Sequence, residues 1–274
     1  MTDDVASTMA ALQESQHGRG FDYEPGSPHL RHPRLRNEII ARIRALVDEQ
    51  FAKNGRCRVL EIGAGHGSFT DHIAATGAEV TVTEMSRPSL ELLQQRFKWN
   101  PKVRLLYDAD GEAVLQDAAR YDVVLCVSVL HHVPDYLGFV ERLASRIDEG
   151  GAFASFQDPL WYPRRSRLNM NADRWAYYAW RIGQGDLLRG VSTRVRRARK
   201  LYDETNEADM VEYHVVRQGV DDQGLADLLR DRFASVEPWT YWSTQLPLLQ
   251  AVGSSTGAAT TFGLVARNRL PSAT

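Results

Sequence analysis

The sequence predicts a doubly wound α/β fold, in which helices cover both faces of a seven-stranded, mostly parallel sheet. Three observations carry this prediction. Short β-rich runs alternate with helical stretches from residue 57 to residue 158, a pattern typical of parallel strands joined by right-handed crossovers. A glycine-rich turn follows the first run. Two further β-rich runs close the chain after a long interruption.

The chain is expected to begin with two segments that precede the sheet. Residues 1–33 are rich in Gly and Pro without a strong period, which predicts a short helix followed by an irregular arm. From Leu35 to Phe51 apolar residues recur at helical spacing, and Gly55 ends this pattern. The second segment is therefore predicted to be a helix that packs on the sheet.

The core of the prediction is a set of five strands with helices between them. Helices are expected at 68–76, 88–98, near 112–119 and at 136–147. Because strands and helices alternate, all five strands should run parallel. Asp158 and Pro159 end the fifth strand. The five strands are expected in the runs CRVLEI, EVTVTE, VRLLYD, YDVVLCVSVL and GAFASFQ.

Residues 160–212 interrupt this alternation with a stretch that is rich in Trp, Tyr and Arg and too long for a simple connection. It is predicted to be a helical insertion over one edge of the sheet. Asp221 or Asp222 should then cap a helix that runs through Leu229. The last two strands, FASVEPWTYW and TTFGLVARN, are separated by a long link that holds Pro247, Gly253 and Gly257, and they are joined most easily as an antiparallel pair. The predicted organisation is an arm or lid (1–33), a ligand-binding core (34–159), a substrate cap (160–212) and the remainder of the core (213–274).

Composition indicates a soluble globular protein. The 274 residues are 43% hydrophobic and 25% charged, which argues against disorder and against a fibre. The N-terminus is acidic, and the longest apolar run is far shorter than the ~20 residues of a membrane span, so a cytoplasmic location without a transmembrane segment is expected. Cys57 and Cys126 lie in or beside strand patterns and lack metal-ligand spacing, which predicts core thiols and no metal site.

Charge is distributed unevenly along the chain. Residues 161–200 hold eleven Arg or Lys against two Asp, so this segment has a net charge of +9 and the remainder of -11. An imbalance of this size points to a partner or an interface. A homo-oligomer is therefore one possibility that the sequence leaves open.

A candidate ligand site follows the first strand. The segment VLEIGAGHGSFT leaves a buried strand at Glu61, turns through Gly63, Gly65 and Gly67, and opens a helix. Glycines permit positive φ and close approach of a ligand, and a helix N-terminus offers free N–H groups. Glu84 ends the second strand, where a carboxylate can accept hydrogen bonds from both ribose hydroxyls.

The third strand ends in a further acidic residue. Asp108, followed by Ala109, can accept a hydrogen bond from the exocyclic amine of an adenine. Asp110 lies close enough to take this place instead. Glu84 as a plain surface glutamate is the competing interpretation.

These motifs, with the run from Tyr121 through His131-His132-Val-Pro134, resemble class I S-adenosylmethionine-dependent methyltransferases. Within that class the chain is most similar to the ubiquinone and menaquinone biosynthesis type. The resemblance covers residues 35–158 well, the last two strands reasonably and the insertion not at all. It implies a Rossmann-like fold, S-adenosyl-L-methionine as cofactor and S-adenosyl-L-homocysteine as product. The residues it implies for cofactor binding are Glu61, Gly63, Ala64, Gly65, Glu84, Met85, Asp108, Ala109, Cys126 and Val127.

A nicotinamide dehydrogenase is the rival on the same kind of fold. Its fingerprint is G-x-G-x-x-G, whereas this chain has G-x-G-x-G preceded by Glu61. Both features favour the methyl donor. By the resemblance, Glu61 orders the glycine loop and lies near the cofactor's ammonium group; the alternative is a carboxylate that satisfies loop amides.

Candidate catalytic residues lie past the fourth and fifth strands. His131 and His132 follow the fourth strand at the carboxyl edge of the sheet, where open α/β sheets bind ligands. One of them, His131 in the first instance, is a candidate general base for an acceptor that must lose a proton. Asp158 is directed at the same crevice. The alternatives are strand-end caps for the histidines and an ordinary Asp-Pro turn for Asp158.

Substrate contacts are expected from the arm and the insertion. Tyr23, His29 and His32 lie in the arm, a region that family members often use as a lid; a disordered tail with a few surface histidines is the alternative. Trp161 and Tyr178 belong to the aromatic insertion. Interleaved aromatic and Arg residues suit an apolar pocket with an anionic subsite, and hence a prenylated, acyl or phosphorylated small molecule. Core packing of these aromatics is the competing interpretation.

Two rival functions remain. Basic and aromatic residues also form nucleic-acid footprints, but the fourth strand lacks the Asn/Asp-Pro-Pro-Tyr/Phe signature of base-amine methylation and the pI is near 6.5. No nucleic-acid partner is therefore expected. The second rival is a cofactor-binding protein that does not methylate or that catalyses a cyclisation. Our prediction is methyl transfer to an O or C atom of a small molecule.

Overall fold

A computed structural model describes residues 26–183 and 219–271, and these residues form one seven-stranded sheet of order β3-β2-β1-β4-β5-β7-β6. The first five strands pair in parallel, and β7 runs antiparallel to both of its neighbours. The predicted doubly wound sheet with an antiparallel final pair is confirmed. The strands are β1 (Arg58–Ile62), β2 (Glu79–Glu84), β3 (Val103–Tyr107), β4 (Tyr121–Val127), β5 (Ile147–Pro159), β6 (Phe233–Tyr241) and β7 (Thr261–Arg269).

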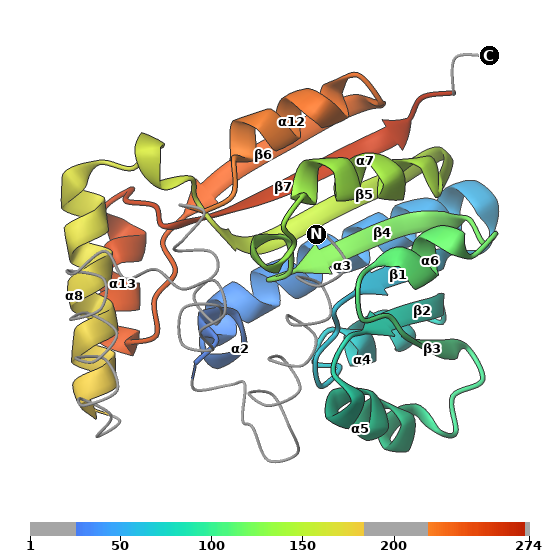
Figure 1. Cartoon of the computed structure of the whole chain (residues 1–274), viewed down its shortest axis with the longest axis horizontal. Helices are drawn as coiled ribbons and strands as arrows, with labels where there is room; N and C mark the ends of the chain where they lie inside the picture. The colour runs from blue at the N-terminus through green and yellow to red at the C-terminus, as the bar shows by residue number, and fades with distance from the viewer. Residues whose placement is uncertain (1–25, 184–218, 272–274) are drawn as a thin grey trace.

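Helices cover both faces of the sheet (Figure 1). Helices α3, α4 and α5 enclose one apolar core, to which they contribute Ile43, Ile73 and Leu93. Helices α6, α7 and α12 enclose the other. Burying each such aliphatic side chain stabilises the fold by about 1.5–3 kcal/mol, so both cores are needed. The helices are α3 (Pro33–Asn54), α4 (Thr70–Ala74), α5 (Arg87–Phe97), α6 (Glu112–Gln116), α7 (Tyr136–Ser145) and α12 (Asp222–Arg230).

The ends of two helices follow from local sequence. Helix α3 begins with Pro33, whose missing N–H costs nothing at the first helical position. It ends at Gly55, which takes a left-handed φ of 67° as the C-cap. Helix α12 is capped by Asp221, whose carboxylate accepts the Gly224 N–H at 2.9 Å. The predicted helix and its stop at Gly55 are confirmed, and Asp221 is the capping residue of the two considered.

Helix α13 (Pro247–Ser255) was missed by the sequence prediction, which treated this stretch as a link because of Pro247, Gly253 and Gly257. Pro247 stands at the helix start, where proline is tolerated. Gly253 lies against the indole of Trp242, where an added Cβ would come within 2.3 Å of the ring. The contact with Trp242 therefore requires a glycine at position 253. Because glycine has a low helix propensity, the same residue argues against a helix when the sequence is taken alone.

Two element ends differ from the prediction. Strand β4 stops at Val127, three residues early, because Ser128 takes a positive φ of 60° and leaves the ladder. The chain then forms a 3₁₀ turn, η1 (Leu130–His132). Helix α4 begins at Thr70 instead of Ser68 because the glycine turn continues to Gly67, where φ is still 81°.

The described part of the insertion is mostly helical. It contains the 3₁₀ turn η2 (Tyr162–Arg164) and helix α8 (Arg167–Gly183), which lies with α13 beyond the carboxyl ends of the parallel strands (Figure 1). Arg164 pairs at 2.6 Å with Asp221 and Asp222, and Arg165 pairs at 2.8 Å with Asp173. Within the described part of the insertion, Arg164 and Arg165 thus have structural partners. The short helix α2 (Pro28–Arg31) packs against the start of the chain's first long helix, α3.

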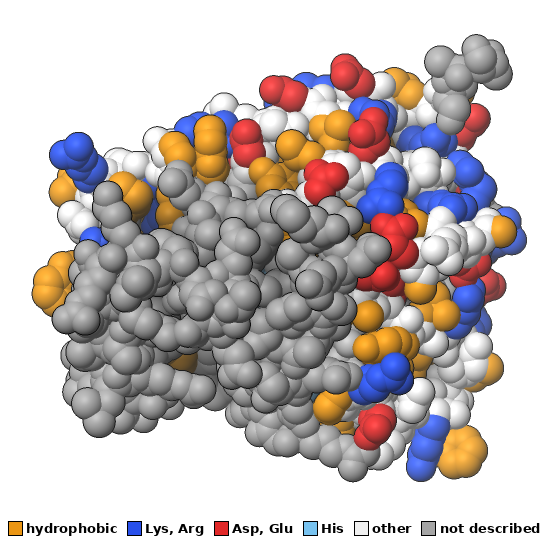
Figure 2. All heavy atoms as spheres, viewed as in Figure 1, with side chains coloured by type: hydrophobic (Ala, Val, Ile, Leu, Met, Phe, Trp, Pro, Cys, Tyr) orange, Lys and Arg blue, Asp and Glu red, His pale blue; other side chains and the backbone are white. Residues whose placement is uncertain are grey.

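The visible surface carries mixed charge. Figure 2 shows acidic and basic side chains interspersed over α7 and α12, where Arg232 pairs with Glu141 and Arg142 with Glu112. No helix within 26–183 and 219–271 combines the length and apolar character needed to cross a membrane. Both cysteines are free and buried, as predicted.

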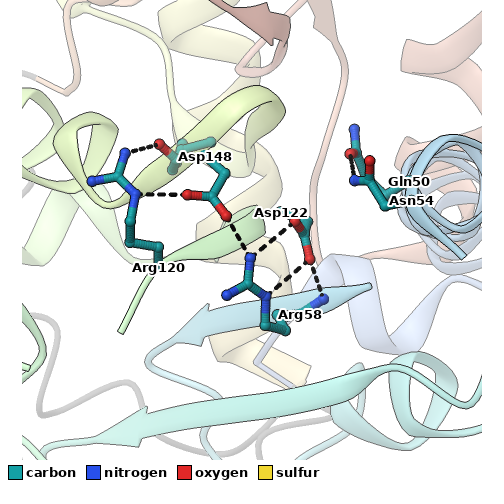
Figure 3. Close-up of polar contacts among 7 residues, drawn as sticks. Gln50, Asn54, Arg58, Arg120, Asp122 and Asp148 are labelled. Atoms are coloured by element: carbon teal, nitrogen blue, oxygen red, sulfur yellow. Dashed lines mark hydrogen bonds and ion pairs between the residues drawn. The ribbon is translucent and has the colours of Figure 1, made fainter. Parts of the chain in front are cut away.

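An ion-pair network ties three strands together at the amino edge of the sheet (Figure 3). Asp122 of β4 is buried and accepts the backbone N–H of Arg58 at 2.7 Å and its guanidinium at 3.3 Å. Asp148 of β5 accepts from Arg58 and from Arg120. Burial raises the pKa of Asp148, but the two guanidinium groups outweigh it and lower its pKa overall. The network fastens β1, β4 and β5 at the edge opposite the candidate site.

Replacing Asp122 should destabilise the protein strongly. In Asp122→Ala the half-buried Arg58 N–H and part of its guanidinium lose their buried acceptor, which costs about 2–4 kcal/mol of unfolding free energy. Urea denaturation measures the loss. The control is Glu38→Gln, which removes an exposed pair with Arg42 and should cost less than about 1 kcal/mol. Equal losses in both variants would contradict a structural role for the network.

Candidate cofactor and substrate site

The glycine turn forms the centre of the candidate site. Gly63, Gly65 and Gly67 take φ values of 64°, 57° and 81°, conformations that other residues adopt only with strain. The Gly63 N–H donates to the Thr83 carbonyl at 2.9 Å and so fastens the turn to β2. Gly63 is exposed at the carboxyl edge of the sheet. The turn therefore presents backbone to a ligand, as the sequence predicts.

A side chain at Gly67 should destabilise the turn more than positive φ alone explains. An added Cβ would lie 2.8 Å from Leu93 and 3.0 Å from Phe97, both buried in the core. Gly67→Ala should therefore cost about 2–4 kcal/mol, from strain and overpacking together. Gly55→Ala is the matched control, because Gly55 has φ 67° with nothing within 4 Å. It should cost only about 1–2 kcal/mol in the same denaturation experiment, and identical losses would remove the packing argument.

Glu84 joins the glycine turn to the second strand. Its two carboxylate oxygens accept the N–H groups of Gly65 and Ser86, each at 2.8 Å. The side chain is buried, and this burial raises its pKa more than the two N–H groups lower it. The carboxylate is therefore held in one orientation next to the turn.

Asp108 follows the third strand, and of the two candidates Asp108 and Asp110 it is the buried one. Its oxygens accept the N–H groups of Ala113 and Val114 at 3.1 Å, so it also caps the start of α6. Burial raises its pKa. Asp110 is exposed and accepts the Glu112 N–H. Each Asp108 oxygen keeps a second lone pair for a ligand.

Glu61 is the most deeply placed of the three carboxylates. It accepts the Thr70 hydroxyl at 2.6 Å, which links the first strand to the start of α4. Its pKa is raised to about 7, mainly by burial and also by the nearby carboxylates of Asp71 and Glu84, while the hydrogen bond from Thr70 lowers it. A cationic group beside Glu61 would relieve this unfavourable burial of charge.

The residues at this edge fit S-adenosyl-L-methionine. Three adjacent strands end in buried acceptors, Glu61, Glu84 and Asp108, around one exposed glycine turn. The cofactor offers an ammonium group, two ribose hydroxyls and an adenine amine, which are all hydrogen-bond donors. A dinucleotide would bring its phosphates among these carboxylates, which is electrostatically unfavourable.

The other predicted cofactor residues lie at the same edge. Ala64, Met85 and Ala109 are half-buried in the loops after β1, β2 and β3. Val127 ends β4 and is half-buried. Cys126 has its side chain fully buried in the core, so only its backbone is available to a ligand. Their contacts with the cofactor stay a prediction.

The structure brings His131 and Asp158 together. Asp158 Oδ1 lies 2.8 Å from His131 Nδ1 and also accepts the His131 backbone N–H at 3.2 Å. Its other oxygen accepts the Ser155 hydroxyl at 2.7 Å. Burial lowers the pKa of His131 to about 3, and burial raises the pKa of Asp158 to about 6. At neutral pH the pair is thus a carboxylate that holds a neutral imidazole, with Nε2 as the acceptor.

His132 lies beside this pair, and its charge lowers the pKa of Asp158 against the effect of burial. Its ring centroid is 4.0 Å from that of His131, at an angle of 44°. His131 is therefore the histidine that the structure places in a dyad. Its use as a base stays a prediction.

Two arm histidines lie next to the site. His29 is buried, stacks on Phe69 at 5.9 Å and has no hydrogen-bond partner at Nδ1. Burial lowers its pKa to about 3. His32 Nε2 lies 2.7 Å from the Thr244 carbonyl, which connects the arm to the segment after β6. Tyr23 lies outside the described residues.

The two predicted aromatic contacts belong to the insertion. Arg164 lies over the ring of Trp161 at 4.9 Å. Tyr178 is half-buried on α8, with its ring centroid 6.1 Å from that of Tyr177. These contacts are internal to the insertion, and a role in substrate binding stays a prediction for both residues.

Sequence reasoning missed the residues that support the dyad. Ser155 bonds Asp158 from within β5, and Tyr241 and Gln157 bond each other next to it. The one signal in the sequence is Ser155, a polar residue inside an apolar strand. Thr70, the partner of Glu61, was likewise treated only as part of a helix.

Comparison with known proteins identifies the family. A family model described as a methyltransferase domain matches residues 31–194, more than half of the chain. The ubiquinone biosynthesis O-methyltransferase of Coxiella burnetii is 29% identical over 106 residues, which are 38% of this chain and 44% of that protein. Its counterpart from Aromatoleum aromaticum is 35% identical over 95 residues, which are 34% and 41% of the two chains. The chain spans less than half the length of these curated relatives.

Solved structures share the fold over almost the whole chain. An N-methyltransferase from Bradyrhizobium japonicum in complex with S-adenosyl-L-homocysteine has a TM-score of 0.53 at 15% identity, covering 97% of this chain and 99% of that one. The plantazolicin methyltransferase BpumL, in complex with the same compound, has a TM-score of 0.54 at 13% identity, covering 98% of each chain. The chain therefore belongs to the methyltransferase-domain family and has the Rossmann-like fold of S-adenosylmethionine-dependent methyltransferases.

Proposed function

We propose that this protein is an S-adenosyl-L-methionine-dependent methyltransferase that acts on an O or C atom of a small molecule. The observation that carries the proposal is the set of three buried carboxylates, Glu61, Glu84 and Asp108, at the ends of adjacent strands around the glycine turn. Membership of the methyltransferase-domain family supports it.

The chain's own groups have distinct tasks toward the cofactor, which supplies an electrophilic methyl group when bound. Glu84, held by Gly65 and Ser86, accepts hydrogen bonds from the ribose hydroxyls. Asp108 accepts from the adenine amine, and Glu61 compensates the ammonium charge. Because these acceptors are already fixed by backbone and side-chain donors, little ordering is needed on binding.

The dyad favours an acceptor that must lose a proton. His131 is neutral, its Nδ1–H is directed at Asp158, and Nε2 can take a proton from a hydroxyl or an acidic carbon. Asp158 then stabilises the imidazolium that forms. Relatives named ubiquinone biosynthesis O-methyltransferase make a hydroxyl the first acceptor to test.

The substrate is a small molecule with an apolar part, and an anionic group is the second feature we propose. The aromatic side chains of the insertion would supply the apolar contacts. Arg164 and Arg165 already pair with aspartates, so an anionic group would have to use other basic residues of the insertion. Phenolic and prenylated hydroxy acids are therefore the first acceptors to screen.

Calorimetric titration with S-adenosyl-L-homocysteine tests the cofactor site. Glu84→Gln should weaken binding about 10- to 100-fold, because an amide cannot accept from both ribose hydroxyls while it accepts from Gly65 and Ser86. Glu79→Gln is the matched control, because Glu79 is exposed at the opposite end of the same strand. It should bind like the unmodified protein.

The outcomes of the titration and of the acceptor screen distinguish the proposed function from its rivals. No binding to the unmodified protein would overturn the methyltransferase proposal and favour a nicotinamide ligand, which the same titration can test. Binding without methyl transfer to any screened acceptor would favour a non-methylating protein. Methylation of nucleic acid would contradict the small-molecule proposal.

A further inference from the structure

Strand β5 changes its side-chain alternation directly before Asp158. In a regular strand, residues three apart point to opposite faces, so Ser155 and Asp158 could not meet. The register of β5 against β7 shifts between Phe156 and Asp158, which leaves Gln157 as an extra residue in a bulge. The bulge places Asp158 on the same face as Ser155, whose hydroxyl it accepts at 2.7 Å.

Gln157 is held in a conformation that its side chain disfavours. Its φ is 67°, and Ser128 has φ 60°. The two residues directly follow Phe156 and Val127, the last pair of the β4–β5 ladder. The Ser128 N–H donates to the Phe156 carbonyl at 2.8 Å, and the β4–β5 ladder ends at this level, while β5 continues to pair with β7 through Pro159. Left-handed backbone at two neighbouring residues other than glycine is uncommon and is maintained only by its surroundings.

The edge strand β6 and the segment after it supply those surroundings. Tyr241 Oη accepts the Gln157 backbone N–H at 2.9 Å and donates to the Gln157 side-chain oxygen at 3.2 Å. The Gln157 amide donates to the Ser243 hydroxyl at 2.6 Å. Burial raises the pKa of Tyr241, so its hydroxyl stays protonated as a donor.

We propose that Gln157 is a positioning residue, whose bulge, clamped by Tyr241 and Ser243, delivers the Asp158 carboxylate to His131. Through Asp158 the bulge sets which ring nitrogen of His131 bears the proton. The inference rests on the proposed function in so far as His131 is the base of that reaction.

A pair of variants separates the effect of the left-handed backbone at Gln157 from the effect of the Gln157 side chain. Gln157→Gly and Gln157→Val both lose the amide, but glycine accepts φ 67° whereas a β-branched residue opposes it. The readout is the ¹⁵N spectrum of the His131 ring, which reports the Nδ1–H tautomer without any substrate. Gln157→Gly should keep the Nδ1–H signal of the unmodified protein, and Gln157→Val should lose it.

Asn268→Val controls for the general effect of strain. Asn268 also has a positive φ, of 56°, but lies at the opposite end of the sheet on β7. It should leave the His131 spectrum unchanged even if it destabilises the fold to the same extent. Tyr241→Phe, which keeps the ring and removes the hydroxyl that bonds Gln157, should broaden or shift the His131 signal.

The outcomes for the bulge and for the proposed function can be distinguished. Where methyl transfer is observed, Gln157→Val should lower kcat as much as Asp158→Asn does, and the double variant should lose no more than either single one. An unchanged His131 spectrum in Gln157→Val, or the same spectral change in Gln157→Gly, would overturn the positioning role. A spectrum that changes as expected in a protein without methyl transfer would leave this role standing and reject the function.

Discussion

His131→Asn should lower kcat about 10²- to 10⁴-fold while the affinity for S-adenosyl-L-homocysteine stays within about threefold. Asn keeps a polar group near Asp158 but cannot take a proton, so the loss falls on the transfer step. The three cofactor carboxylates lie on or directly after β1, β2 and β3, whereas His131 follows β4 and its ring pairs with Asp158 of β5. The measurement is single-turnover methyl transfer beside calorimetry.

Asp158→Asn tests the same dyad from its other side. An amide in this place no longer fixes the Nδ1–H tautomer and no longer stabilises the imidazolium, so a loss of similar size is expected. Because burial lowers the pKa of His131, the base stays neutral across pH 6–9. The profile of kcat against pH should therefore fall only on the acid side, where Asp158 takes up a proton below about pH 6. If His131→Asn reduced kcat less than threefold, the proton would have to leave by another route.

Affinity for S-adenosyl-L-methionine should rise with pH up to about 7 and then level off. Burial raises the pKa of Glu61 to about 7, so in the free protein this carboxyl holds a proton below that pH. A cationic ligand requires the carboxylate, and binding must release the proton. Each unit below pH 7 should therefore weaken binding up to about tenfold. Titration in buffers of different ionisation enthalpy measures the released proton directly.

Glu61→Gln should abolish this pH dependence and weaken binding at pH 8. In the ligand-free protein, by contrast, the same substitution should raise the free energy of unfolding. The folded-state pKa of Glu61 lies above its ordinary value of 4.5, so its contribution to stability is complete below pH 4.5 and is lost as pH rises through about 7. At pH 8 Glu61→Gln should thus stabilise the ligand-free protein by about 1–3 kcal/mol. A variant that is less stable and still binds with pH dependence would contradict the role of Glu61.

Much of the fold could be predicted because its signals are local. Helix α3 repeats its apolar residues with a helical period, and β2 is an uninterrupted β-rich run. The predicted stop at Gly55 and the positive φ of Gly63 also depend only on what a residue permits at its own position. Helix α13 was missed because a contact with Trp242, from another segment, explains its glycine.

The candidate site divides in the same way. Glu84 and Asp108 could be predicted because a strand end marks the carboxyl edge, wherever the rest of the chain lies. Arg164 and Arg165 could not be placed, because their partners lie on α12 and α8. Whether an arginine faces a substrate or an aspartate depends on which segments pack together.

By itself the sequence determined the doubly wound sheet, the glycine turn and the acidic residues that end three of its strands. Only the tertiary structure decided that Asp158 meets His131, 27 residues earlier, and that Tyr241 holds the bulge at Gln157 from 84 residues away. The physical reason is that one extra residue in a strand exchanges its two faces. That exchange follows from pairing between strands, and no local period in the sequence records it.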